Sequence, residues 1–466
     1  MKSLFDLYCI NVLVNDVKTN SKEVFLNDAF VCVKGVNVDR HQYIDEAIKR
    51  GASFLIVSKG KKYPIPYVKV KNTNKELINI LSNVYSDAKN IGIIAITGTD
   101  GKTTTASIIR DMIGYDYCGY IGTNGVKGKY FNANSENTTP AIEYNYKYLD
   151  KFAKEKLKYA TIEASSEGML HKRLEGFKFK IGILTNFTED HLNVHKTLKN
   201  YLKCKKKVFH NIDKDGLAIL NMDDKFYKQF RKSCNCSVVT YGKNKYSTLR
   251  IIDYELFPNK TRIKYMLKKN IFIIESPLVG EFNVYNLSAA ILTLLSLNYN
   301  ISEIRKRILN IKTPYGRCEF LNYNTEYKIF LDYAHTVNGI KSVLTYLNSI
   351  KKRKIITVIG SAGGREKEKR PSMGKVAQNL SDIVIYTMDD PRYEKVLDIV
   401  NEMVDKSKRN YLIEIDRKKA IHMALEMAQK DDIVAILGKG RDNYMAIFDK
   451  KILYSDLLVL DNYFKK

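Results

Sequence analysis

A glycine-rich turn followed by a lysine and threonines carries the clearest chemistry in the sequence. It comes directly after the aliphatic run 91–96 and opens an apolar-periodic stretch that predicts a helix. A strand, a glycine turn and a helix N-terminus together point backbone N–H groups and the positive end of the helix dipole at an anion. The lysine can reach terminal phosphates, and a threonine hydroxyl can hold Mg²⁺. We therefore predict a phosphate-binding loop made by Gly98, Thr99, Asp100, Gly101, Lys102, Thr103 and Thr104.

Two further polar residues follow aliphatic runs that predict buried strands. Glu163 comes directly after the run 159–162, and His191 stands in a loop after the run 181–184. In a mainly parallel sheet such strand ends lie at one edge, where open α/β sheets bind ligands. A carboxylate beside a phosphate-binding loop is a suitable Mg²⁺ ligand, so the two residues predict a joint metal site. A purely structural role for a lone histidine is the alternative.

The order of the expected elements predicts an α/β protein of three domains. The length of 466 residues agrees with this number at about 150 residues per domain. Residues 1–86 predict a small N-terminal α/β domain, residues 87–312 a central, mainly parallel P-loop sheet, and residues 313–466 a Rossmann-like doubly wound domain. We expect strands at 29–33, 54–57, 355–359, 383–387 and 433–437, and a helix at 41–50.

Composition excludes several classes of protein. No apolar run approaches the ~18 residues of a membrane span, and the N-terminus meets Asp6 and Asn11 too early for a signal peptide. Seven dispersed cysteines predict reduced thiols and a cytoplasmic location. The formal net charge of +26 could indicate nucleic-acid binding, but the lysines are spread along the whole chain and no nucleic-acid motif accompanies them. We predict no nucleic-acid partner.

The motifs and their order resemble the Mur ligase family, and within it the MurE type. The resemblance rests on the compact loop G-T-x-G-K-T, on Glu-x-Ser-Ser at residues 163–166, on Asp-Tyr-Ala-His at 332–335 and on Asp-x-Pro-Arg at 389–392. It implies an ATP- and Mg²⁺-dependent ligase acting on UDP-N-acetylmuramoyl-L-alanyl-D-glutamate. The glutamate carboxylate would be phosphorylated by ATP, and an amino acid would displace the phosphate to leave an amide. We expect the protein to be a monomer.

The resemblance assigns roles to residues of this chain. Those implied in catalysis are Lys102, Glu163, His191 and Lys205, and the implied metal ligands are Thr103, Glu163, His191 and Lys205 as a carbamate. A carbamate requires a neutral amine, and the neighbouring Lys203, Lys206 and Lys207 are expected to lower the pKa of Lys205. ATP would also contact Asn283, Asn286, Arg317, Asp332 and His335. The UDP-sugar dipeptide would contact Ser21, Asn137, Thr138, Thr139, Ser165 and Arg173, and the amino acid would contact Arg365, Asp389, Asp390, Pro391, Arg392, Gly438 and Asp442.

Several positions depart from the family pattern and leave the added amino acid open. Arg392 favours meso-diaminopimelate, because its guanidinium would pair with the distal carboxylate that lysine lacks. Arg441 and Asp442 replace a histidine and a glutamate, so L-lysine remains an alternative. Glu167 replaces a histidine and Asn193 an aspartate, which keeps open a related ligase with another acceptor. A non-catalytic binding protein on this fold should have lost Lys102, Glu163 or Lys205, and all three are retained.

Overall fold

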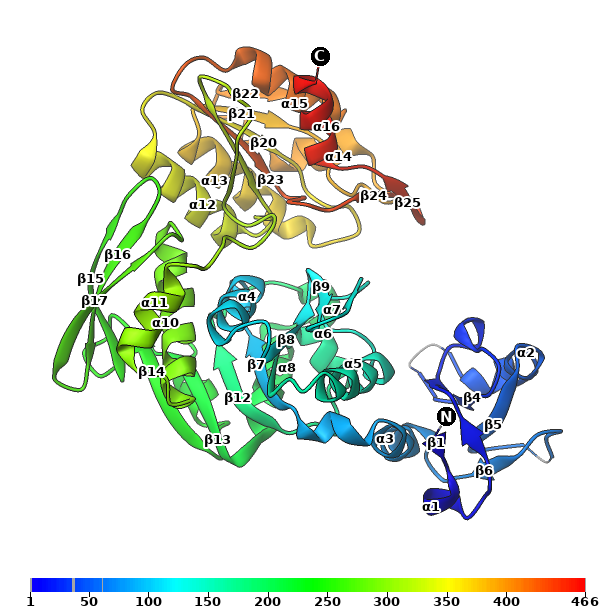
Figure 1. The fold of residues 1–466 in the computed structure, drawn as a ribbon. Helices are drawn as coiled ribbons and strands as arrows, with labels where there is room; N and C mark the ends of the chain where they lie inside the picture. The colour runs from blue at the N-terminus through cyan, green and yellow to red at the C-terminus, as the bar shows by residue number, and fades with distance from the viewer. Residues whose placement is uncertain (1, 36–37, 61, 466) are drawn as a thin grey trace.

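The computed structural model describes residues 2–35, 38–60 and 62–465, and most of its strands belong to three sheets (Figure 1). The N-terminal sheet has four parallel strands in the order β3-β4-β5-β6. The helix expected over 41–50 is divided into a 3-10 turn and a short α-helix, because the Asp39 side chain accepts a hydrogen bond from the His41 N–H and starts the turn. The elements of this part are β1 (Lys2–Ser3), α1 (Phe5–Tyr8), β2 (Leu13–Val14), β3 (Val17–Lys18), β4 (Asp28–Val31), α2 (Ile44–Lys49), β5 (Ala52–Val57), β6 (Tyr67–Lys69) and α3 (Thr73–Val84).

The central sheet has eleven strands in the order β10-β9-β8-β11-β7-β12-β13-β14-β15-β16-β17. Neighbours from β8 to β15 pair in parallel, as predicted, whereas β9, β10, β16 and β17 add antiparallel edges. The strands are β7 (Gly92–Thr97), β8 (Cys118–Gly122), β9 (Gly125–Lys127), β10 (Asn132–Ala133), β11 (Tyr159–Glu163), β12 (Phe179–Leu184), β13 (Ile212–Asn221), β14 (Ser237–Gly242), β15 (Leu249–Leu256), β16 (Thr261–Leu267) and β17 (Asn270–Ser276).

The helix α4 of the central part begins directly after the glycine turn that follows β7. The helix α4 begins at Lys102, directly after Gly101, whose φ of 82° is a left-handed conformation that glycine adopts without strain. The long helix α10 packs against α4. The helices of this part are α4 (Lys102–Ile113), α5 (Ile142–Lys154), α6 (Ser166–Leu170), α7 (Leu192–His195), α8 (Leu198–His210), α9 (Tyr227–Arg231), α10 (Glu281–Ser296) and α11 (Ile301–Ile308).

The C-terminal sheet has six strands in the order β18-β19-β23-β20-β21-β22, all parallel except β18. The strands expected at 355–359 and 433–437 are confirmed at those bounds. The strands are β18 (Glu319–Leu321), β19 (Lys328–Asp332), β20 (Ile355–Ile359), β21 (Ile383–Tyr386), β22 (Tyr411–Ile413) and β23 (Ile433–Leu437), with a hairpin of β24 (Tyr444–Ile447) and β25 (Lys450–Leu453). The helices are α12 (Val337–Ile350), α13 (Arg370–Leu380), α14 (Val396–Met403), α15 (Arg417–Met427) and α16 (Asp456–Phe464).

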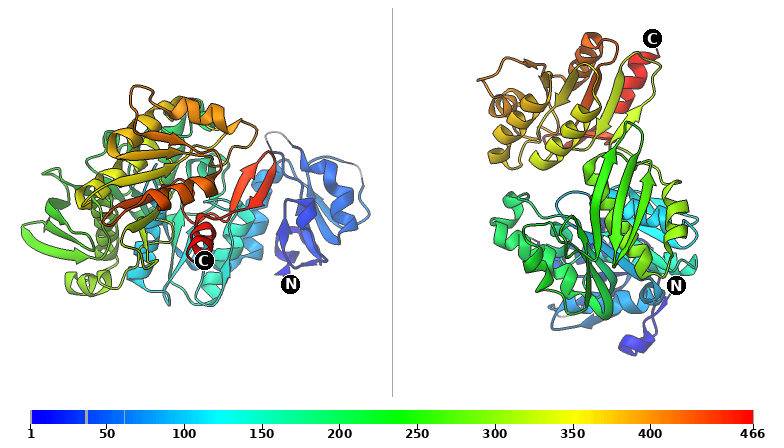
Figure 2. Two further views of the ribbon diagram at one scale, coloured as in Figure 1. Left: turned by 90° about the horizontal axis from the view of Figure 1, so that it is seen from above. Right: turned by 90° about the vertical axis from the view of Figure 1, so that its left-hand side faces the viewer.

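The aliphatic strands of the C-terminal sheet are buried on both faces, which explains their continuous hydrophobic runs. In β20, Ile355 and Ile359 pack in one core and Ile356 and Val358 in the other, following the two-residue period of a strand. Two further views show the N-terminal part at the periphery of the central part and the antiparallel strands β15–β17 extending beside the C-terminal part (Figure 2). Within the described residues, no helix combines the length and the apolar character needed to cross a membrane.

Candidate active site

The phosphate-binding loop lies at the carboxyl end of β7 and rests on the segment that follows β12. The Thr99 N–H donates to Asn186 O at 3.0 Å, and the Thr185 hydroxyl donates to Asp100 O at 2.6 Å. A Cβ on Gly98 would lie 1.8 Å from Thr185 Oγ1, so this close approach requires glycine. Lys102 Nζ donates to the carbonyls of Gly98 and Thr99 at 2.9 and 2.8 Å, which holds its ammonium beside the loop.

Sheet register places Glu163 beside this loop. Glu163 ends β11 opposite Ile96 of β7, and its side chain is fully buried. One carboxylate oxygen accepts the Tyr120 hydroxyl at 2.5 Å and the Thr123 N–H at 2.9 Å. The other oxygen accepts the hydroxyls of Thr103 at 2.9 Å and Thr123 at 3.1 Å. The carboxylate and the Thr103 hydroxyl therefore meet at the N-terminus of α4.

His191 lies at the start of α7 in a left-handed conformation with φ 57°. Its ring nitrogens lie 3.8 Å from Glu167 Oε1 and 3.6 Å from Asp190 Oδ2. Burial, opposed by Asp190 and assisted by Lys205 and Lys102, lowers the pKa of His191 to about 3. The imidazole is therefore neutral at physiological pH and able to bind a metal ion.

Lys205 is buried under the phosphate-binding loop rather than on a solvated helix face. It lies on α8 with 1% of its surface exposed, and its Nζ donates to Gly98 O at 2.6 Å. The Nζ also lies 4.7 Å from the centre of the Tyr201 ring. Burial and then the charge of Lys102 lower its pKa well below the usual value. The pKa of Lys205 is lowered, as predicted, but the causes are burial and Lys102 rather than the neighbouring Lys203, Lys206 and Lys207.

The oxygen donors at the loop fit Mg²⁺. Among the residues that the structure describes, no three histidine, cysteine, aspartate or glutamate side chains converge into a complete cage. Mg²⁺ in nucleotide sites is commonly held by one or two carboxylates together with substrate phosphates, and Thr103 and Glu163 provide such hard oxygen ligands. The predicted joint site of Glu163 and His191 remains a prediction.

The asparagines predicted to contact ATP lie on α10, behind the phosphate-binding loop. Asn283 and Asn286 are buried, and the Asn286 amide donates to Asn283 Oδ1 at 3.0 Å. The Thr105 hydroxyl donates to Asn286 Oδ1 at 3.1 Å, which connects α10 to α4. A Cβ on Gly101 would lie 2.6 Å from the same oxygen. These two asparagines therefore support the turn from which α4 begins.

The C-terminal part contributes the remaining predicted ATP contacts. Asp332 ends β19 and accepts backbone N–H groups of Cys318 and Ala334, each at 2.7 Å. The Arg317 guanidinium lies 4.9 Å from the centre of the Tyr333 ring, and His335 Nδ1 is 2.7 Å from Tyr333 O. The next residue, Thr336, donates its hydroxyl to Asp100 Oδ1 at 3.3 Å and so connects this segment directly to the phosphate-binding loop.

A second contact between the central and C-terminal parts involves residues that the sequence did not reveal. Lys369 Nζ lies 3.3 Å from Asp190 Oδ1. The Glu366 carboxylate accepts the N–H groups of Leu192 and Asn193, the first two residues of α7. The loop that carries Arg365 therefore contacts the loop that carries His191. The residues lie about 175 positions apart, so no local pattern could have paired them.

Most of the residues predicted for the UDP-sugar dipeptide lie together beside Glu163. Thr139 is buried, and its hydroxyl donates to Glu163 O at 2.6 Å and lies 2.9 Å from Ser165 Oγ. Arg173 Nη1 donates to Thr139 O at 2.9 Å, and the Thr138 hydroxyl lies 3.2 Å from that of Thr123. Asn137 is in the same loop, and its carbonyl accepts the hydroxyl of Ser135. Ser21 lies in the N-terminal part, where it donates to Glu46 Oε2 at 2.7 Å.

The residues predicted for the amino acid surround a buried lysine that the sequence analysis missed. Lys439 has 1% of its surface exposed, and its Nζ lies 2.8 Å from Asp390, 3.5 Å from Asp389 and 3.9 Å from Asp442. Burial raises the pKa of Asp442 to about 6. A Cβ on Gly438 would lie 2.6 Å from Asp389 Oδ2, so the glycine allows this close packing. The only signal for Lys439 was its place in Gly-Lys-Gly at the end of β23.

Arg441 is turned away from this cluster and forms an ion pair with Glu319. Pro391 packs closely against the loop that carries Arg365, because a Cβ on Gly363 would lie 2.0 Å from Pro391 O. The guanidinium groups of Arg365 and Arg392 form no hydrogen bond or ion pair with the described residues 2–35, 38–60 and 62–465.

Comparisons with known proteins agree with this geometry. Residues 96–294 match the model of the Mur ligase middle domain, and residues 316–440 match the Mur ligase, glutamate ligase domain. A Fusobacterium nucleatum protein named UDP-N-acetylmuramoyl-L-alanyl-D-glutamate–2,6-diaminopimelate ligase is 36% identical over 94% of this chain and 92% of its own length. An Aquifex aeolicus protein of the same name is 33% identical over 98% of this chain and 94% of its own length.

A solved structure of an enzyme with that name has a TM-score of 0.68 and 26% identity, covering 99% of this chain and 98% of its own. The predicted α/β fold is confirmed by this similarity. Mur ligases use ATP and Mg²⁺, which confirms the predicted cofactor requirement. The near-complete coverage by relatives more than 30% identical confirms the predicted family. The chain belongs to the Mur ligase family of ATP-dependent ligases.

Proposed function

We propose that the chain joins 2,6-diaminopimelate to UDP-N-acetylmuramoyl-L-alanyl-D-glutamate at the expense of ATP. The observation that carries the proposal is a pair of arginines, Arg365 and Arg392, whose guanidinium groups have no partner among the described residues. They belong to the segments around Lys439 and its acidic neighbours Asp389, Asp390 and Asp442. An amino acid with two carboxylates and two amines complements this arrangement. Its carboxylates would pair with the arginines, and its distal amine with Asp442. The names of the relatives support the same substrates.

The residues of the phosphate-binding loop would promote the first step. Backbone N–H groups at the start of α4 and the Lys102 ammonium offset the negative charge that develops on the transferred phosphoryl group. His335 would approach the same charge from the C-terminal part. Mg²⁺, when bound, would be held by Thr103 and Glu163, with His191 and carbamylated Lys205 as further ligands, and would neutralise phosphate charge.

The second step requires the amine of the incoming amino acid to reach the acyl phosphate before water does. The contacts of Thr336 with Asp100 and of Lys369 with Asp190 bring the C-terminal part over the phosphate-binding loop. A closed arrangement of this kind excludes water from a reactive intermediate. It also places the loop of Arg365 beside the nucleotide site, where the amine is needed.

L-lysine is the second candidate, because the acidic cluster would accept its distal amine equally well. Lysine lacks the distal carboxylate, so it would leave Arg392 desolvated and unpaired at a cost of ~3 kcal/mol. This difference predicts a preference for diaminopimelate of about 100-fold.

The test measures phosphate release with ATP, Mg²⁺ and the nucleotide dipeptide while the amino acid is varied. We expect release with meso-diaminopimelate and at least about 100-fold lower kcat/KM with L-lysine. Lys102→Ala should abolish release while the unfolding transition is retained. Release with neither amino acid would refute the proposal, as would undiminished turnover by the Lys102 variant. An Arg392→Ala variant that keeps the wild-type preference would refute the assignment of the distal carboxylate.

A further inference from the structure

Arg370 is a fully buried cation between the two loops assigned to the incoming amino acid. It begins α13 and has 0% of its surface exposed. Its Nη1 donates to Glu394 Oε2 at 2.9 Å and its Nη2 donates to Glu394 Oε1 at 3.1 Å, the parallel two-bond geometry of a strong arginine–carboxylate pair. Nη1 also donates to Glu402 at 2.6 Å, and Nη2 to the carbonyl of Ala362 at 3.0 Å. One guanidinium therefore joins three segments of the chain.

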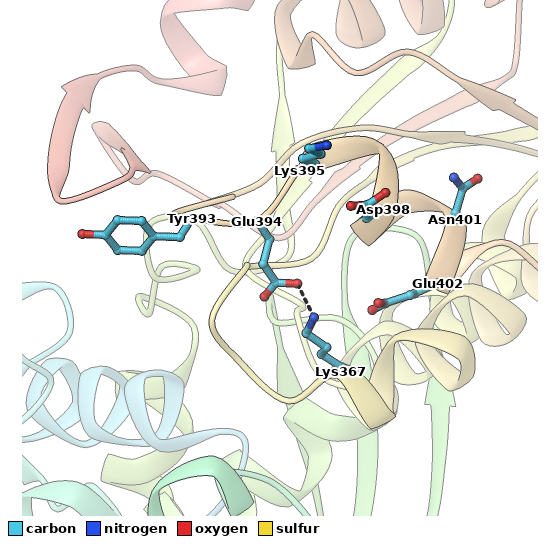
Figure 3. A pocket seen from close by; sticks show the side chains of 7 residues that line it. All are labelled: Lys367, Tyr393, Glu394, Lys395, Asp398, Asn401 and Glu402. Carbon is cyan, nitrogen blue, oxygen red and sulfur yellow. Dashed lines mark ion pairs between the residues drawn. The ribbon is translucent and has the colours of Figure 1, made fainter.

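Glu394 extends the network to the loop that carries Arg365. Its Oε1 accepts the Gly364 N–H at 2.6 Å, and its Oε2 lies 3.1 Å from Lys367 Nζ (Figure 3). Gly364 directly precedes Arg365, and Glu394 stands two residues after Arg392. Hydrogen bonding to Arg370 lowers the pKa of Glu394 to about 2, so the carboxylate is ionised at physiological pH. The Glu394 carboxylate thus connects the segment that carries Arg392 to the backbone of the loop that carries Arg365.

The two loops also touch through their backbones, so their separation is narrowly defined. The Gly363 N–H donates to Asp390 O at 2.8 Å. Arg392 itself has a φ of 52°, a conformation that a non-glycine residue adopts only under constraint from its surroundings. Its Nη1 lies 4.0 Å from the position that a Cβ would take on Gly364. The guanidinium of one loop therefore lies against the backbone of the other.

We infer that the Arg370–Glu394 pair sets the spacing between Arg365 and Arg392 and thereby selects an amino acid with two carboxylates. The inference rests on the proposed function. Neither Arg370 nor Glu394 contacts the substrate in this scheme, so both are positioning residues. A displacement of about 1 Å between groups that clamp a substrate is enough to cost up to about 100-fold in rate. Breaking the pair should therefore weaken binding of the amino acid and leave binding of ATP and of the nucleotide dipeptide unchanged.

Glu394→Gln tests this inference with little change in shape. A pocket of about 590 Å³ opens on the outer side of the pair and is lined by Glu394, Glu402 and Lys367, so an amide is accommodated there (Figure 3). The amide nitrogen would face the Arg370 Nη1–H and cannot accept its hydrogen bond, which breaks the two-bond pair. We expect KM for meso-diaminopimelate to rise at least about 10-fold, and the preference over L-lysine to fall by a similar factor. KM values for ATP and for the nucleotide dipeptide should stay within about twofold.

Glu402→Gln is the matched control. It removes the carboxylate on α14 that also accepts a hydrogen bond from Arg370. Where the structure describes the chain, the Glu402 side chain forms no hydrogen bond or ion pair with either amino-acid loop. We expect this control to keep the wild-type preference between the two amino acids. Arg370→Lys provides a second variant, because it keeps the charge but loses the two-bond geometry, and it should reproduce the effect of Glu394→Gln.

The outcomes separate this inference from the proposed function. Wild-type protein that uses neither amino acid refutes the proposed function itself. Active wild-type protein with a Glu394→Gln variant of unchanged KM and preference refutes only the positioning role. A variant that raises all three KM values equally, or loses ATP binding together with its thermal transition, shows a merely structural role and also overturns the inference.

Discussion

Substitutions of Glu163 can distinguish its predicted role as a Mg²⁺ ligand from its role in the surrounding hydrogen bonds. The buried carboxylate accepts four hydrogen bonds, of which three come from hydroxyl groups of Tyr120, Thr103 and Thr123 and one from a backbone N–H. In Glu163→Gln the amide oxygen keeps the Tyr120 hydroxyl and the Thr123 N–H. The amide nitrogen faces the two threonine hydroxyls, which can accept as well as donate. The variant therefore keeps a complete set of hydrogen-bonding partners.

The two substitutions at this position should differ in stability. We expect Glu163→Gln to change the free energy of unfolding by about 1 kcal/mol, because charge-assisted bonds become neutral ones while a buried charge is removed. Glu163→Ala leaves the Thr123 N–H without an acceptor and opens a cavity, so it should cost about 3–5 kcal/mol. Both variants lose the negative charge that would hold Mg²⁺. Loss of outer-sphere groups alone typically costs about 10–100-fold in metal affinity, so loss of a ligand should cost at least about 100-fold.

The assay measures phosphate release over a range of Mg²⁺ concentrations, together with thermal unfolding of each variant. Glu163→Gln should unfold within a few degrees of the wild-type protein and require at least about 100-fold more Mg²⁺ for half-maximal activity. A variant with unchanged Mg²⁺ dependence would refute the assignment of Glu163 as a ligand. A Glu163→Gln variant as unstable as Glu163→Ala would refute the account of its hydrogen bonds.

Three further predictions follow from the same site. Because the pKa of Asp442 is raised to about 6, its carboxylate gains a proton below that pH. KM for diaminopimelate should therefore rise about fivefold from pH 6 to pH 5, and Asp442→Asn should flatten this dependence. Because burial favours the neutral amine of Lys205, removal of dissolved CO₂ should lower turnover and added bicarbonate should restore it, whereas indifference to CO₂ would contradict the carbamate. Gly363→Ala would place a Cβ 2.0 Å from Pro391 O; we expect a loss of about 1–3 kcal/mol in unfolding free energy and a raised KM for the amino acid, measured by denaturant unfolding and steady-state kinetics.

The strand–turn–helix geometry of the predicted phosphate-binding loop was predictable because its signals are local. The aliphatic run of β7, the glycines and the start of α4 lie within 20 consecutive residues, and each has a direct conformational meaning. The C-terminal strands β20 and β23 were predictable for the same reason, since strands buried on both faces are continuous hydrophobic runs.

Contacts between distant segments could not be derived from local patterns. Lys205 lies among four lysines on a helix that resembles a solvated face, yet it is buried because its Nζ meets Gly98 O, 107 residues away. Arg370 ends a highly charged stretch that is typical of a surface loop. It is nevertheless one of the two largest fully buried side chains among the described residues, because Glu394 and Glu402 neutralise it. In both cases the partner lies on another element, and only the fold brings the two together.

The contact between Glu366 and the first N–H groups of α7 has a consequence for the timing of turnover. Any opening between the central and C-terminal parts must break this contact and the ion pair of Lys369 with Asp190. The side chains of Lys369 and Asp190 are only 21% and 6% exposed, so dissolved salt screens this ion pair weakly. Opening of the two parts, and with it the release of product, should therefore depend little on ionic strength.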